Sequence, residues 1–259
     1  MIQCQIMDLP GLSLEEQILY SKITSNDLES IKMDLLTSED TFEKAKILLL
    51  NLRNIISTMG KVWNEEHDLQ GELQTEVESL TSNDIERFYA NMNPVTEMIR
   101  SRFPIRRSEK AVAVGTLINI HAISELLELS LREKGYLTYY WGVELTTDKI
   151  KTHLDQNSAN ILVLSCMAVN TEFNCFDELR KLRETYPTLK IIVGGQAFQM
   201  FLVLKDDPEN PALTKPYKEH NYYDKIKKAN TLRDFVTHEF SVIYCETLDD
   251  IQQEIETNL

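Results

Sequence analysis

The stretch Lys110-Ala111-Val112-Ala113-Val114-Gly115-Thr116-Leu117-Ile118-Asn119-Ile120-His121 decides the fold of this chain. It begins with a short apolar run, and Gly115 follows as a turn residue. An apolar run without alternation is typical of a strand that helices cover on both faces. The next residues, 121–134, read as an amphipathic helix that ends at Gly135. The stretch therefore predicts a strand, a loop and a helix.

Apolar strands continue to alternate with helices along the rest of the chain. We expect strands at 137–141, 160–165, 190–195 and 240–245, with helices at 147–155, 173–185 and 247–257. This order is typical of a parallel sheet, here a Rossmann-like, flavodoxin-like α/β fold. Residues 208–230 are polar, proline-punctuated and locally basic, which indicates an insertion at about 204–235.

The N-terminal part has a different texture. Between Ser13 and Arg102 the only glycines are Gly60 and Gly71, and apolar residues recur at three- and four-residue spacing. Ser13-Leu14-Glu15-Glu16 fits a capping box at a helix start. We expect helices at 13–22, 26–36, 40–65, 68–80 and 83–101. The prediction is a helical bundle over 1–104, followed by the α/β domain over 105–259.

Composition limits the classes of function. The 259 residues carry 41 acidic and 27 basic side chains, a formal net charge of -14 that phosphate backbones repel. We therefore expect no direct binding of nucleic acid. No apolar run is long enough to cross a bilayer, and the N-terminus lacks the pattern of a secretory signal. Four cysteines without zinc spacing indicate reduced thiols in a cytoplasmic protein that does not bind membranes.

The loop after the first strand of the α/β domain holds the candidate metal ligand, His121. Loops at the carboxyl ends of parallel strands are where such sheets bind ligands. A helix N-terminus disfavours imidazolium, and a neutral imidazole is the form that binds a metal. Asn119 is placed to accept a hydrogen bond from the other ring nitrogen. The alternative is that His121 is an ordinary polar loop residue.

The α/β domain resembles the cobalamin-binding domain family over about residues 108–200. That family carries Asp-x-His-x-x-Gly in its first loop, and the matching stretch here is Asn119-Ile120-His121-Ala122-Ile123-Ser124. A helix ending at Gly135, Ser165-Cys166-Met167 after the third strand, and Gly194-Gly195 after the fourth follow in the order of the family.

The resemblance implies that His121 is the lower ligand of cobalt, and that Ser165, Gly194 and Gly195 line a channel for the nucleotide tail. The glycine pair has a second interpretation, a tight turn between strand and helix. Two residues depart from the motif: Asn119 replaces a carboxylate, and Ser124 replaces a glycine. A site changed in this way is weakened, adapted to another tetrapyrrole such as biliverdin or haem, or lost.

The helical part carries a second resemblance. Met59-Gly60-Lys61-Val62-Trp63 is similar to the Gly-x-x-Trp segment in the helical domain of cobalamin-dependent light-responsive transcription regulators. The resemblance implies that Trp63 packs over the upper face of the cofactor. The Glu-His pair of that family is missing, and His67, one turn after Trp63, is the candidate replacement. The alternatives are a core position for Trp63 and a solvent-facing His67.

These observations favour a regulatory sensor, not an enzyme, that binds cobalamin or a related tetrapyrrole, as a photoreceptor does. Only about a dozen residues precede the first expected helix, so we expect no DNA-binding domain and a signal that passes through a protein partner such as a transcription regulator. Residues 215–228, basic and aromatic, are a candidate contact surface. The alternatives are a cofactor-free interaction protein with a degenerate site and, third, a corrinoid carrier protein for methyl transfer. The oligomeric state stays open, with a homo-oligomer among the states allowed.

Overall fold

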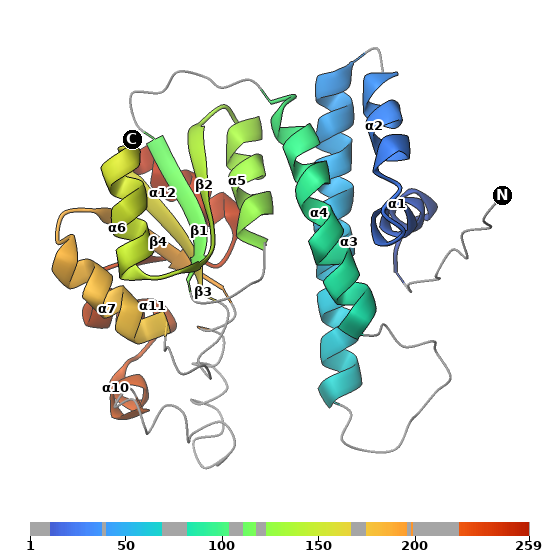
Figure 1. Cartoon of the computed structure of the whole chain (residues 1–259). Helices are drawn as coiled ribbons and strands as arrows, with labels where there is room; N and C mark the ends of the chain where they lie inside the picture. The colour runs from blue at the N-terminus through green and yellow to red at the C-terminus, as the bar shows by residue number, and fades with distance from the viewer. Residues whose placement is uncertain are drawn as a thin grey trace. The chain divides into compact units, whose positions relative to one another are not determined.

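The computed structural model describes residues 11–37, 40–68, 82–103, 111–117, 123–166, 175–195, 198 and 223–258. The chain divides into two compact units, Met1–Pro104 and Ile105–Leu259. The first is made of helices, and the second combines a sheet with helices (Figure 1).

The helical unit holds four helices in its described residues: α1 (Leu14–Thr24), α2 (Leu28–Leu36), α3 (Thr41–Asp68) and α4 (Ser82–Arg100). Each of the four contacts the other three. Their buried apolar side chains form the core of the unit, and Tyr20 of α1 stacks on Phe88 of α4 with ring centroids 5.5 Å apart. The helix expected at 68–80 lies outside the described residues except for its first position, Asp68.

The predicted capping box at the start of α1 is confirmed. The backbone amide of Ser13 donates to Glu16 Oε2 at 2.7 Å, and the amide of Glu16 donates to Ser13 Oγ at 3.3 Å. Glu16 also accepts from Asn54 Nδ2 of α3 at 2.7 Å, and this bond, followed by the bonds with Ser13, lowers the pKa of the Glu16 carboxyl. The Glu16 carboxylate thus caps the N-terminus of α1 and also links α1 to α3 by a hydrogen bond.

The α/β unit is built on a five-stranded parallel sheet in the order β2-β1-β3-β4-β5. The strands are β1 (Ala111–Leu117), β2 (Leu137–Leu145), β3 (Ile161–Cys166), β4 (Lys190–Gly194) and β5 (Ile243–Tyr244). Every residue of β1 is buried, as its apolar run predicts, but the turn expected at Gly115 is wrong, because the strand continues through Gly115 to Leu117. This strand order is the flavodoxin-like one, so the expected α/β fold class is confirmed.

Helices cover both faces of the sheet and create two cores. They are α5 (Ile123–Glu133), α6 (Thr147–Gln156), α7 (Cys175–Thr185), α10 (Tyr223–Lys228), α11 (Leu232–Phe240) and α12 (Leu248–Asn258). One core joins the sheet to α7 and α11 through Phe176, Phe235 and their neighbours. The other joins it to α5 and α12 through Leu131 and Ile255. No helix in the described part of either unit is long and apolar enough to cross a membrane.

The segment expected as an insertion at about 204–235 differs in its last part. Residues 199–222 lie outside the described residues. The helix α10 begins at Tyr223, and α11 begins at Leu232. Leu232, Phe235, Val236 and Phe240 are buried, and their spacing of three and four residues is that of a helix face. Polar residues between them hide this stripe in the sequence, where it follows a long polar stretch.

Candidate functional site

The candidate site lies at the carboxyl edge of the sheet. In the parallel register Thr116 of β1 is level with Ser165 of β3, and Ser165 is level with Gly194 of β4. The chain runs from β1 to β2 on one side of β1 and then returns to β3 on the other side. This reversal between β1 and β3 is the switch point at which open α/β sheets bind ligands. β1 ends beside this point at Leu117, and Asn119 and His121 follow it in the sequence, outside the described residues.

Thr116 and Ser124 form a buried hydrogen bond. Their hydroxyl oxygens are 2.6 Å apart, and both residues are almost completely inaccessible to solvent. The bond joins the end of β1 to the first turn of α5. Ser124, the residue that departs from the glycine of the family motif, therefore uses its hydroxyl inside the fold.

The hydroxyl of Ser165 differs from that of Thr116, the residue level with it on β1. Ser165 is only partly buried, and its hydroxyl has no hydrogen-bond partner among the residues that the structure describes. An available hydroxyl at the edge of the sheet is able to bind a polar group of a ligand. Of the predicted tail-channel residues, Ser165 is the one whose side chain is free to do so.

Gly194 and Gly195 are required by the protein's own backbone. A Cβ atom added to Gly194 would lie 2.6 Å from the carbonyl oxygen of Cys245, beside the end of β5. A Cβ on Gly195 would lie 2.6 Å from the carbonyl oxygen of Cys166, and Gly195 also has a φ of +112°. Both glycines let neighbouring chain segments approach closely. The fold alone accounts for the pair, so the pair is no independent sign of a ligand.

Cys166 and Cys245 lie at the same edge as buried free thiols. Burial, and then the neighbouring thiol of Cys175, raises the pKa of Cys166, and burial raises the pKa of Cys245 to about 12. The reactive form of a cysteine is the thiolate, and the raised pKa of both side chains favours the thiol form at neutral pH. The sequence analysis named Cys166 directly after the third expected strand and ended the last expected strand at residue 245, but it predicted no role for either cysteine.

The remaining predicted site residues are not placed as side chains. Asn119 and His121 lie outside the described residues. Trp63 and His67 belong to α3, but their side chains are outside the described part of the chain. Within the described residues no three His, Cys, Asp or Glu side chains form a group that could hold a metal ion.

Comparisons with known proteins give structural likenesses only. No protein-family model and no curated protein matches the chain. A novel cobalamin-binding protein from Desulfitobacterium hafniense DCB-2 is similar at 11% identity and a TM-score of 0.35, over 80% of this chain and 90% of that one.

Two further matches come from Methanosarcina barkeri. The methanol:cobalamin methyltransferase complex MtaBC matches at 12% identity and a TM-score of 0.39, over 93% of this chain and 76% of that one. The monomethylamine corrinoid protein matches at 14% and 0.46, over 92% and 95%. Likenesses at this level identify no family for the chain.

Proposed function

We propose that the α/β unit binds cobalamin, with His121 as the lower ligand of cobalt, and that the protein is a regulatory sensor acting through a protein partner. The observation that carries this proposal is the partly buried hydroxyl of Ser165, which lies at the switch point of the sheet and has no hydrogen-bond partner among the described residues. The sequence attaches His121 to the strand at the centre of that switch point. The order of His121, Ser165 and Gly194 along the chain follows the cobalamin-binding motif, with Asn119 in place of its carboxylate and Ser124 in place of its glycine.

The donor set fits a corrinoid in chemistry. An imidazole is a suitable axial donor for cobalt, and Asn119 would orient its ring through the second nitrogen. Ser165, whose hydroxyl has no hydrogen-bond partner among the described residues, would offer it to the nucleotide tail. When bound, an alkylcobalamin supplies a cobalt–carbon bond that visible light breaks, which is the chemistry of a light signal. Gly194 and Gly195 contribute backbone only, because neighbouring backbone fills the space beside them.

A cofactor-free interaction protein is the second candidate function. It is supported by the bond between Ser124 and Thr116 and by the contact between Gly194 and Cys245, which show polar and glycine positions of the motif already used by the fold. The two candidates differ in one respect: only the first requires His121 for binding of a cofactor.

Absorption spectra distinguish them. Purified protein is titrated with hydroxocobalamin and, in parallel, with haem and biliverdin, as wild type and as His121→Ala. His238→Ala is the matched control, because His238 is exposed on α11. We expect hydroxocobalamin to bind wild type and the control with the same spectral shift, and His121→Ala to lose it. Absence of binding by all three ligands supports the cofactor-free candidate.

The sensor part has its own test. Protein loaded with adenosylcobalamin is kept dark or illuminated, and hydrogen exchange of backbone amides is compared between the two samples. We expect illumination to change exchange in α3 and α4 as well as in the α/β unit. Exchange that changes only in the α/β unit would leave cobalamin binding in place and contradict signalling through the helices.

A further inference from the structure

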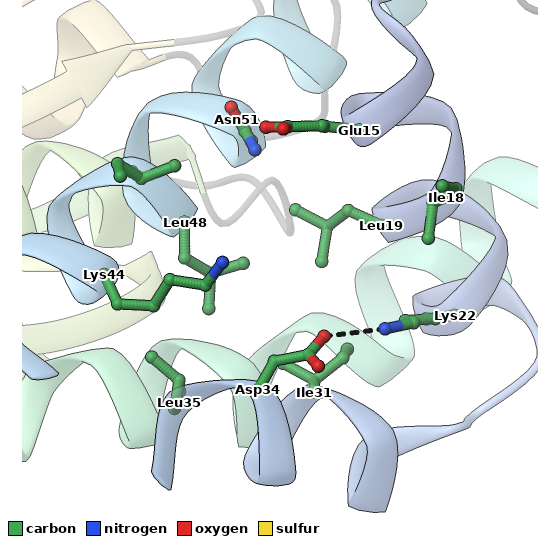
Figure 2. A pocket seen from close by; sticks show the side chains of 11 residues that line it. Glu15, Ile18, Leu19, Lys22, Ile31, Asp34, Leu35, Lys44, Leu48 and Asn51 are labelled. Atoms are coloured by element: carbon green, nitrogen blue, oxygen red, sulfur yellow. Dashed lines mark hydrogen bonds and ion pairs between the residues drawn. The ribbon is translucent and has the colours of Figure 1, made fainter. Parts of the chain in front are cut away.

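A groove with an apolar floor lies between α1, α2 and α3 of the helical unit (Figure 2). Its volume is about 200 Å³. Leu19, Ile31, Leu35 and Leu48 form the floor and are buried, so they belong to the core of the unit. The groove is open to solvent along its rim and is independent of the sheet edge described above.

The rim exposes large apolar side chains. Ile18 of α1 is 38% exposed and Ile47 of α3 is 46% exposed, and both line the groove. Leu14 and Leu50, the neighbours of these residues on the same two helices, are exposed by more than half. Apolar surface gathered around a groove marks an interaction site, since single exposed apolar residues would be scattered. A small ligand in the groove would leave the apolar side chains of the rim exposed to solvent, whereas a protein surface would cover them.

Charges sit at the two ends of the groove. Lys22 is paired with Asp34 at 2.7 Å, and this pair lies near Lys44 at one end, while Glu15 lies beside Asn51 at the other (Figure 2). The side chains of Glu15 and Lys44 have no hydrogen bond or ion pair with any described residue. With respect to the described residues, the groove therefore carries one unpaired negative charge, Glu15, and one unpaired positive charge, Lys44, separated along its length.

This arrangement is complementary to itself. A two-fold axis through the middle of the groove would place Glu15 of one copy over Lys44 of the other, and the reverse, as isologous contacts require. The charged lining residues, Glu15, Lys22, Asp34 and Lys44, sum to zero, whereas the whole chain carries -14. The net negative charge of the chain opposes self-association in general, but the groove has no net charge and therefore does not add to this repulsion.

We propose that this groove is the interface of a homodimer, in which Ile18 and Ile47 of each copy close over the other. Eleven residues line the groove, fewer than the roughly 20–30 per side of a standard interface. The dimer is therefore a reversible one, in equilibrium with the monomer. The proposal concerns the helical unit alone and stands whether or not the α/β unit binds cobalamin.

Sedimentation velocity of the full-length protein, without added cofactor and over a range of concentrations, tests it. We expect a monomer–dimer equilibrium that Ile47→Glu weakens by about tenfold or more, because each dimer would bury two carboxylates. Met33→Glu is the control: Met33 is 55% exposed on α2 but does not line the groove, and its substitution should leave the equilibrium unchanged. A protein that stays monomeric throughout, or a dimer that Ile47→Glu does not weaken, overturns the proposal.

A charge exchange separates the interface from a general effect on folding. Lys44→Glu alone sets two carboxylates against each other and should weaken the dimer, by about five- to tenfold at low salt. Adding Glu15→Lys in the same chain exchanges the two charges and should restore most of the affinity. Circular dichroism of each variant reports folding. A double variant that is as weak as the single one contradicts the proposed pairing.

Discussion

The two units of this protein use their polar and apolar groups in opposite ways. At the sheet edge of the α/β unit, Thr116 and Ser124 satisfy each other, and the backbones of Cys166 and Cys245 occupy the space beside Gly195 and Gly194. Along the groove of the helical unit, apolar side chains are exposed, and Glu15 and Lys44 have no partner among the described residues. Motif residues can thus serve the fold itself, while a surface without any motif shows the unsatisfied groups of a binding site. The predictions below test this contrast.

The largest effect is expected in the aromatic core of the α/β unit. Phe235 is 3% exposed and packs against Phe176 and Phe240. Phe235→Ala should lower the free energy of unfolding by about 3–5 kcal/mol, because it leaves a cavity. Leu50→Ala, at a side chain 53% exposed in the helical unit, should change it by about 0.5 kcal/mol or less. Urea unfolding followed by circular dichroism measures both, and equal losses would contradict the contrast.

The next effect concerns the glycine pair. Gly195→Ala combines a left-handed backbone with a backbone contact, and we expect it to cost about 2–4 kcal/mol. Gly142 is a matched control, because its φ is +89° but no atom lies within 4 Å of an added Cβ. Gly142→Ala should cost only about 1 kcal/mol, the strain of its backbone. If the two variants unfold at the same urea concentration, the close contact with Cys166 does not matter.

A smaller effect is expected from the buried pair of hydroxyls. Ser124→Ala and Thr116→Val each leave one hydroxyl without this partner, which should cost about 1–3 kcal/mol. The double variant removes both groups and should cost less than the sum of the single changes, by at least about 0.5 kcal/mol. Strictly additive costs in thermal unfolding would show that the two hydroxyls do not depend on each other.

The smallest effect depends on pH. Glu178 of α7 accepts from the backbone amide and hydroxyl of Thr147, both at 2.9 Å, at the start of α6. Burial raises the pKa of Glu178, but hydrogen bonds from Lys181 and Thr147 outweigh it and hold that pKa below its ordinary value of 4.5. The lowered pKa means that this stabilisation is complete above about pH 4.5 and is lost as the pH falls through the folded-state value.

We therefore expect Glu178→Gln to lower the free energy of unfolding by about 1 kcal/mol at neutral pH, as the loss of a helix N-cap does. The difference from wild type should shrink below about pH 4.5. Thermal unfolding at several pH values measures it, and a difference that stays constant into the acid range would exclude a role for the carboxylate charge.

Local patterns predicted most of the fold. The capping box at Ser13 and the continuous apolar run of β1 depend only on neighbours in the sequence, and both appear in the structure. The sequence analysis missed the helix α11 because its apolar stripe directly follows a long polar segment. Periodicity alone does not show whether such a stripe belongs to the insertion or to the folded domain after it.

The site was less predictable than the fold. Sequence order placed Ser165 and Gly194 at the same edge, but not the bond between Ser124 and Thr116, which depends on how α5 packs on β1. The exposure of Ile18 and Ile47 could not be foreseen either. Their spacing fits a buried helix face equally well, and only the packing of three helices decides which apolar residues are covered.

The central claim is that a histidine of this protein binds cobalt, and electron paramagnetic resonance tests it directly. Protein grown with ¹⁵N-histidine is loaded with cob(II)alamin, and the hyperfine splitting from the axial nitrogen is recorded for wild type and for His121→Ala. The account predicts a doublet from ¹⁵N in wild type and its loss in His121→Ala. A triplet in wild type, which shows that the cofactor keeps its own ¹⁴N base, or the absence of any bound cob(II)alamin, would contradict it.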